Sequence, residues 1–187
     1  MTDTSTLTAW TQADLEQAQL AHGRFLAGLP DGRRAVLTGA VLAGLDFSNH
    51  DWRDADLRDC DLASAKLDGA DFSGARLSGA CLDGASLVGT ALDAADLRGV
   101  TMKQARLVAC RARAADFRDY ARPDGHGGFQ TLTTSLEGAD LAGADLARAR
   151  LAGVKASGAV LDDADLSGAR FNRAELDGAS LRGARLA

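Results

Sequence analysis

A five-residue repeat runs through most of this chain. From Ala35 onward the sequence divides into fives such as AVLTG, ADLRD and ADFSG, and we denote the third residue of each five position i. Leu37 to Phe117 contains 17 such repeats and Leu136 to Leu186 contains 11 more, 28 in total. Position i is Leu in 20 repeats, position i−2 is Ala in 20, and position i+2 is Gly in 15. A repeat this regular indicates stacked structural units.

The period of five limits the backbone conformation. It matches neither an α-helix nor a flat β-strand, whose side chains repeat about every 3.6 and 2 residues. Positions i−2 and i point the same way in a short extended segment, whereas i−1 points outward. The small residue at i+2 suits a turn. Equal turns wind the chain into a coil whose turns pair as strands about 4.8 Å apart. A left-handed hexapeptide helix of the acyltransferase type is excluded because it needs a period of six.

The A-D/R-L-x-G pattern resembles that of the pentapeptide-repeat proteins over about 150 of the 187 residues. This resemblance implies an all-β fold, a right-handed quadrilateral parallel β-helix with four pentapeptides in each coil. The 28 repeats would then form about seven coils, or roughly 34 Å of rod at the strand spacing. The 5% aromatic content is consistent with such a repetitive core, since an ordinary core relies more on Phe, Tyr and Trp.

Two segments depart from the repeat. Residues 1–34 are predicted to be an N-terminal helical capping segment, with an amphipathic helix over Trp10 to Leu26 and Thr11 as its N-cap. Residues 35–187 form the pentapeptide-repeat β-helix. Its phase shifts between Phe117 and Leu136, so residues 120–133, YARPDGHGGFQTLT, are predicted to be a 14-residue loop that projects from one corner.

The residue types that carry chemistry form no recognisable constellation. The three histidines are far apart in the sequence, and most Asp residues occupy outward positions. The three cysteines have neither disulfide nor zinc spacing. We therefore expect no catalytic residues, no metal site, no cofactor and no enzyme activity. The sequence also contains no secretory signal or membrane span, which favours a cytoplasmic protein.

The repeat also predicts where individual side chains lie. His50 occupies an inward i−2 position beside Trp52, so we expect it to plug a widened first coil. Cys60 and Cys110 also occupy i−2 and should lie in the core, whereas Cys81 at i−1 should be exposed.

A basic stretch that leads into the predicted loop is the strongest candidate for a binding surface. Loops on a regular scaffold are where recognition usually resides. The chain is predicted to be a non-catalytic scaffold that binds another protein, not nucleic acid or a membrane, through this loop and the adjacent arginines. The expected partner-binding residues are Arg106, Arg111, Arg113, Arg118, Tyr120, Arg122, Asp124, His126 and Phe129.

The resemblance implies an alternative function. Some pentapeptide-repeat proteins protect DNA gyrase and topoisomerase IV from quinolones by imitating duplex DNA. Mimicry requires a continuous negative field, because a duplex carries a charge about every 1.7 Å of its axis. The net charge of this chain is only −5.

The last repeats of the sequence predict a contact between two copies of the chain. A bare terminal coil presents unpaired strand edges together with its leucines. One hypothesis is therefore a homodimer through the C-terminal coil, with Leu176, Leu181 and Leu186 at the interface. The alternative is that charges such as Arg182 and Arg185 are enough to keep this end soluble.

Overall fold

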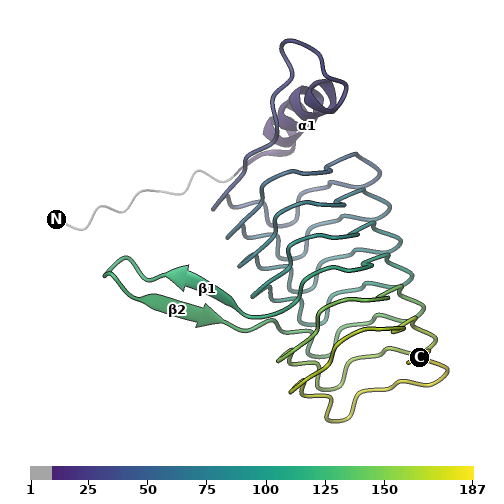
Figure 1. Ribbon diagram of the computed structural model, residues 1–187. Coiled ribbons are helices and arrows are strands. Elements are labelled where there is room, and N and C mark those ends of the chain that lie inside the picture. Colours follow the sequence, from purple (N-terminus) through teal and green to yellow (C-terminus); the bar gives the residue numbers. More distant parts are fainter. Residues whose placement is uncertain (1–9) are drawn as a thin grey trace.

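The computed structural model describes residues 10–187, so residues 1–9 of the predicted capping segment lie outside the described residues. Helix α1 (Gln12–Leu26) stands at one end of a rod of stacked coils (Figure 1). Strands β1 (Tyr120–Pro123) and β2 (Phe129–Leu132) form a hairpin that projects from the side of the rod. No helix in this range is both long enough and apolar enough to cross a membrane.

The coils pair through four parallel ladders. Away from the insertion at residues 120–133, the i−1 residue of a repeat pairs with the residue 20 positions later, so four pentapeptides complete one coil. Each ladder contains seven residues. We name three of the ladders by one member each: the Asp56 ladder runs through Arg76, the Lys66 ladder through Ser86, and the Asp71 ladder through Ala91.

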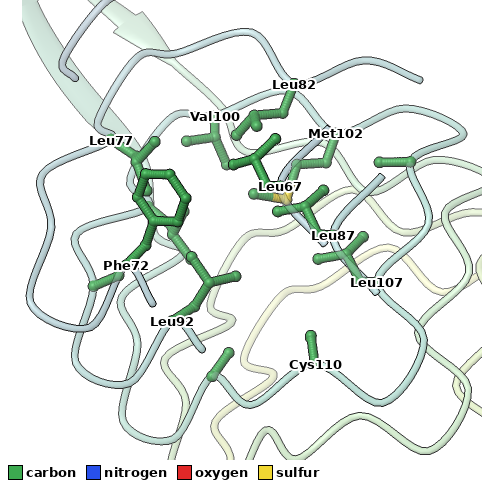
Figure 2. Packing of buried hydrophobic residues seen from close by; sticks show 14 of the residues in the cluster. Leu67, Phe72, Leu77, Leu82, Leu87, Leu92, Val100, Met102, Leu107 and Cys110 are labelled. Atoms are coloured by element: carbon green, nitrogen blue, oxygen red, sulfur yellow. The ribbon is translucent and has the colours of Figure 1, made fainter. Parts of the chain in front are cut away.

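The core is a set of columns that run along the rod. Leu67, Leu87 and Leu107 are 20 residues apart, lie on one wall, and are fully buried (Figure 2). The i−2 alanines fill the space between the larger side chains. The prediction that Cys60 and Cys110 lie in the core is confirmed, because each is only 1% exposed. Burial of this apolar surface is the main stabilising term, at about 25 cal/mol per Å².

Position i+2 turns each corner with a left-handed backbone. Gly69 has a φ of +66°, and the same conformation occurs at non-glycine corners such as Ala94, with a φ of +55°. A residue with a Cβ costs about 1 kcal/mol there, which explains why Gly dominates this position. Asp119 is the i+2 residue of the last repeat before the hairpin, and it is not among the left-handed residues of the described chain.

Helix α1 begins with the predicted cap. The Thr11 hydroxyl accepts a hydrogen bond from the backbone N–H of Asp14 (3.2 Å), and the Asp14 carboxylate accepts one from the backbone N–H of Thr11 (2.9 Å). This reciprocal pair satisfies two N–H groups at the start of the helix. Leu15 belongs to the core of the rod and is 1% exposed, so the helix lies against the first coil.

Side chains and backbone of the N-terminal segment pair with the free edge of the first coil. The Gln12 amide donates to the carbonyl of Asp46 (2.9 Å) and accepts from its N–H (3.0 Å), as a neighbouring strand would. The backbone N–H of Trp10 donates to the carbonyl of Val41 (3.1 Å). An unpaired strand edge is otherwise a template for aggregation.

The histidine in the core is His22, and the prediction for His50 is wrong. His50 is exposed, whereas His22 is fully buried. Helix α1 places the His22 ring parallel to Trp52, with the ring centroids 5.9 Å apart. The site beside Trp52 at which the repeat predicts His50 is therefore occupied by His22, which comes from helix α1 and not from the repeat.

Candidate protein-interaction site

The predicted 14-residue loop is a β-hairpin inserted at one corner. Asp116 pairs with Arg150, 34 residues later instead of 20, and the difference of 14 equals the length of segment 120–133. The coils therefore resume in phase after the insertion. Strands β1 and β2 pair antiparallel from Tyr120 opposite Leu132 to Pro123 opposite Phe129. The shift of the repeat phase predicted a projecting loop, and the structure adds that two short strands pair within it.

Asp124 closes the turn of the hairpin. Its carboxylate accepts hydrogen bonds from the backbone N–H groups of His126 (2.8 Å) and Gly128 (2.9 Å). These two donors lower the pKa of Asp124, because they stabilise the ionised form. Asp124, predicted to bind a partner, thus has a structural task within the hairpin.

The base of the hairpin is fixed along the corner of the rod toward the N-terminal coils. A Cβ added to Gly99 would lie 2.6 Å from the Cβ of Tyr120, and one added to Gly79 would lie 3.3 Å from the Tyr120 ring. A methyl group at Gly99 would therefore overlap the Tyr120 side chain, and one at Gly79 would crowd its ring. The guanidinium of Arg98 lies 5.7 Å from the ring centroid of Tyr120.

A second anchor lies farther along β1. The Arg122 guanidinium contacts the Asp59 carboxylate at 3.3 Å, across 63 residues of sequence, and donates to the side chain of Gln130 on β2 (3.1 Å). Tyr120 and Arg122, both predicted to contact a partner, therefore hold the hairpin to the rod.

Thr134 completes the base, and sequence reasoning did not single it out. Its buried hydroxyl accepts from the backbone N–H of Gly99 (2.9 Å) and lies 3.2 Å from the carbonyl of Arg118, to which it can donate. The feature of the sequence that could have identified Thr134 is a hydroxyl side chain at position i−2, where Ala is usual. Thr90 and Cys60 repeat this pattern, since each donates from i−2 to a carbonyl of the preceding coil.

The parallel ladders agree with the family that the sequence itself indicates, and the hairpin is an insertion into their pattern. The family model for pentapeptide repeats matches the chain in eight copies, over residues 35–74, 55–93, 70–107, 134–168 and 149–187. The chain belongs to the pentapeptide repeat family. Membership implies that the coils form a right-handed β-helix. The matched segments leave out residues 108–133, which include the hairpin.

Comparison with solved structures finds pentapeptide repeat proteins of low sequence identity and low TM-score. HetL from Nostoc sp. strain PCC 7120, involved in regulation of heterocyst differentiation, is 25% identical with a TM-score of 0.38, covering 87% of this chain and 92% of HetL. A trypsin-treated variant of QnrB1, a plasmid-mediated fluoroquinolone resistance protein, is 21% identical with a TM-score of 0.43, covering 81% and 89%. A thylakoid-lumen protein of Arabidopsis thaliana is 22% identical with a TM-score of 0.25, covering 74% and 70%. The sequence matches no curated protein.

The square coil of a pentapeptide repeat protein separates basic residues that are close in sequence. Consecutive pentapeptides occupy consecutive faces, so Arg106 lies in the Lys66 ladder and Arg111 in the Asp71 ladder. Arg118 follows Asp116 of the Asp56 ladder, on the face opposite Arg106. The structure therefore brings Arg118 near the hairpin but does not gather the predicted arginines on one surface.

Carboxylates of this and neighbouring coils pair with most of the basic stretch. Arg118 contacts Asp116 at 2.7 Å, Arg113 contacts Asp145 at 2.5 Å, Lys103 contacts Glu137 at 2.8 Å, and Arg111 pairs with Asp93. Arg106 has no ion pair within residues 10–187. Exposed pairs of this kind stabilise the protein by about 1 kcal/mol or less each. Their main effect is to cancel the positive field that the sequence suggested.

Two hairpin residues of the predicted site remain free to contact a partner. Phe129 on β2 is 72% exposed, and His126 in the turn is exposed. Aromatic residues such as Phe are enriched in protein–protein interfaces, so Phe129 is a candidate contact residue.

Metal ligands and thiols are the other groups in the described residues that could carry chemistry. No group of three His, Cys, Asp or Glu side chains between residues 10 and 187 is arranged to hold a metal ion. Burial raises the pKa of Cys60 to about 11 and that of Cys110 to about 12, so both remain unreactive thiols near neutral pH. Cys81, predicted to be exposed, is only partly so.

Proposed function

We propose that this pentapeptide repeat protein is a non-catalytic scaffold that binds another protein through the hairpin. The observation that carries the proposal is the exposed Phe129 on a hairpin whose base is anchored to the rod by Tyr120, Arg122 and Thr134. Anchoring lowers the entropy lost on binding, because the arm is already ordered. Arg118 stands beside the base and, paired with Asp116, would contribute polar contacts at the rim of the interface.

The phase of the coils provides a sharp test. Deletion of residues 120–133 joins Asp119 to Thr134, so Thr134 becomes the i−2 residue and Leu136 the i residue of the next pentapeptide. The rod should then close without a change of register. Circular dichroism and thermal unfolding should remain close to those of the full chain.

The deletion and a point variant then report on binding. Partners crosslinked to the full-length protein should be lost from the deletion variant and depleted from Phe129→Ala. Leu20→Ala is the matched control, since Leu20 is 57% exposed on α1 at the end of the rod. Recovery of the same partners by all variants would contradict the proposal.

The alternative partner is a type II topoisomerase such as DNA gyrase, bound in place of DNA. The negative charge of the aspartates on the rod supports the topoisomerase alternative less well than the sequence alone suggested. Asp56 and Asp96 are each held by two hydrogen bonds of 2.7 to 2.8 Å, from Arg58 and Arg98. A gyrase supercoiling assay with and without a fluoroquinolone distinguishes the two: an effect that requires residues 120–133 would favour the topoisomerase.

Three finer features complete the proposal. Within the N-terminal segment 1–34, the described residues 10–34 cap the first coil, which is supported by the pairing of Gln12 and His22 with its edge. The C-terminal coil joins two copies of the chain. The protein acts in the cytoplasm, which its three free cysteines support.

A further inference from the structure

Three arginines converge on one corner groove near the C-terminal end of the rod. Arg148, Arg150 and Arg170 line a groove of about 310 Å³ together with Ala114 and Gly168. This volume is at the lower end of the range for small-molecule sites, about 300 to 1,000 Å³. The groove is on the other side of the Asp56 ladder from the hairpin corner, so it is separate from the proposed protein-binding site.

These arginines lack the carboxylates that pair with the basic residues around them. Arg148 and Arg170 make no side-chain hydrogen bond or ion pair within residues 10–187. Arg150 approaches Asp116 only at 3.6 Å, and that carboxylate already accepts two hydrogen bonds from Arg118, of 2.9 and 2.7 Å. By contrast, Arg113, which lines the adjoining groove, is paired with Asp145.

The pairing of the coils places like charges side by side here. Arg150 and Arg170 are directly opposite each other in the Asp56 ladder. No other rung among the described residues joins two cations, and like charges in this position are destabilising. An anion between the two guanidinium groups would remove the repulsion.

The floor of the groove is shaped for the third arginine. A Cβ at Gly168 would lie 3.5 Å from the Cγ of Arg148, so the stem of Arg148 extends over this glycine. The small residues Ala114 and Gly168 leave the space between the guanidinium groups open.

We propose that this groove binds a phosphate group. Guanidinium groups match both carboxylate and phosphate oxygens, often through paired hydrogen bonds. Three groups that approach from two faces of a corner require acceptor oxygens in several directions, which a tetrahedral phosphate offers and a planar carboxylate does not. A phosphate near neutral pH also carries close to two negative charges, compared with one for a carboxylate. The chain itself has a net charge of −5, so general electrostatic attraction would not draw an anion to it.

Isothermal titration calorimetry of the full chain tests the site with three probes. Inorganic phosphate and AMP represent free phosphate and a phosphate ester, and acetate represents a carboxylate. Phosphate or AMP should bind with a dissociation constant in the millimolar range or tighter, and acetate should bind more weakly. Equal affinity for phosphate and AMP assigns the site to the phosphate group alone, whereas tighter AMP binding assigns it to an ester. Absence of binding by both, or equal binding of acetate, overturns the proposal.

A pair of charge-matched variants locates the binding. Arg148→Gln combined with Arg170→Gln should weaken phosphate or AMP binding at least about tenfold, because two charge-assisted hydrogen-bond donors are lost. The control combines Arg33→Gln with Lys66→Gln, which removes the same charge from exposed basic side chains elsewhere. The control should bind as the unaltered chain does. Equal weakening in both variants would show a diffuse charge effect and overturn the site.

Discussion

His22 joins helix α1 to the first coil through both nitrogens of its ring. Nδ1 accepts from the backbone N–H of Ala35 (3.1 Å), so Nε2 carries the proton and donates to the carbonyl of Arg53 (3.0 Å). The ring is stacked between Phe25 and Trp52, with centroid distances of 5.8 and 5.9 Å. Protonation of Nδ1 would remove its acceptor and place a charge in the core, and burial accordingly lowers the pKa of His22 from 6.5.

The pKa shift predicts acid sensitivity near pH 6. A histidine whose folded pKa is depressed stabilises the fold fully above the unfolded pKa of about 6.5 and loses that contribution as the pH falls toward the folded value. The free energy of unfolding should therefore decrease between pH 7 and pH 5, above the range in which the aspartates titrate. Chemical denaturation at several pH values measures this slope.

Two histidine variants test the assignment. His22→Gln should lower stability by roughly 1 to 3 kcal/mol at pH 7, because buried backbone groups lose their partners, and should flatten the slope. His50→Gln changes an exposed histidine and should leave the pH dependence of stability unchanged. An unchanged slope in His22→Gln would refute the role of His22.

At the scale of the element, the anchored hairpin depends on glycine at one corner. Gly99→Ala and Gly89→Ala both place a Cβ on a left-handed residue, with φ values of +64° and +66°, at a cost of about 1 kcal/mol. Only the Gly99 methyl meets the hairpin, 2.6 Å from the Cβ of Tyr120 and 2.8 Å from that of Leu132, whereas nothing lies within 4 Å at Gly89.

Hydrogen exchange separates these two effects. In Gly99→Ala the amides of β1 and β2 should exchange faster, and overpacking should add roughly 1 to 3 kcal/mol of destabilisation. In Gly89→Ala the exchange of the hairpin should be unchanged. If both variants protect the hairpin equally, the corner contact does not anchor it.

A structural feature is predicted well from the sequence when the interactions that cause it lie within a few residues of one another. The coil follows from a repeat in which every five residues make the same turn. A residue at position i, such as Leu67 or Leu87, therefore points inward in every repeat. The core position of His22 was missed because it depends on a helix that packs across the end of the coil. The basic stretch was overestimated because the partners of Arg111 and Arg113 are set by the stacking of coils: Asp93 and Asp145 lie 18 and 32 residues away in the sequence.

At the scale of the whole molecule, the two ends of the rod differ. Helix α1 covers the first coil, whereas the last coil leaves Leu176 and Leu181 half-buried and Leu186 67% exposed. In Figure 1 these residues belong to the yellow end of the rod, far from the helix. Apolar side chains beside unpaired strand edges favour contact with an identical surface around a two-fold axis.

The difference between the two ends of the rod predicts a dimer. A charge introduced at the C-terminal end should abolish it. Sedimentation equilibrium at about 100 μM should give twice the chain mass of 19.3 kDa, because contact between the two C-terminal coils would remove these leucines from water in both copies. Leu186→Glu should yield the monomer, because the carboxylate would be buried without a partner. Leu20→Glu places the same charge on α1, where the side chain is 57% exposed, and should leave the dimer intact. A monomeric unaltered chain, or a dimer lost only in Leu20→Glu, would exclude the C-terminal coil as the interface.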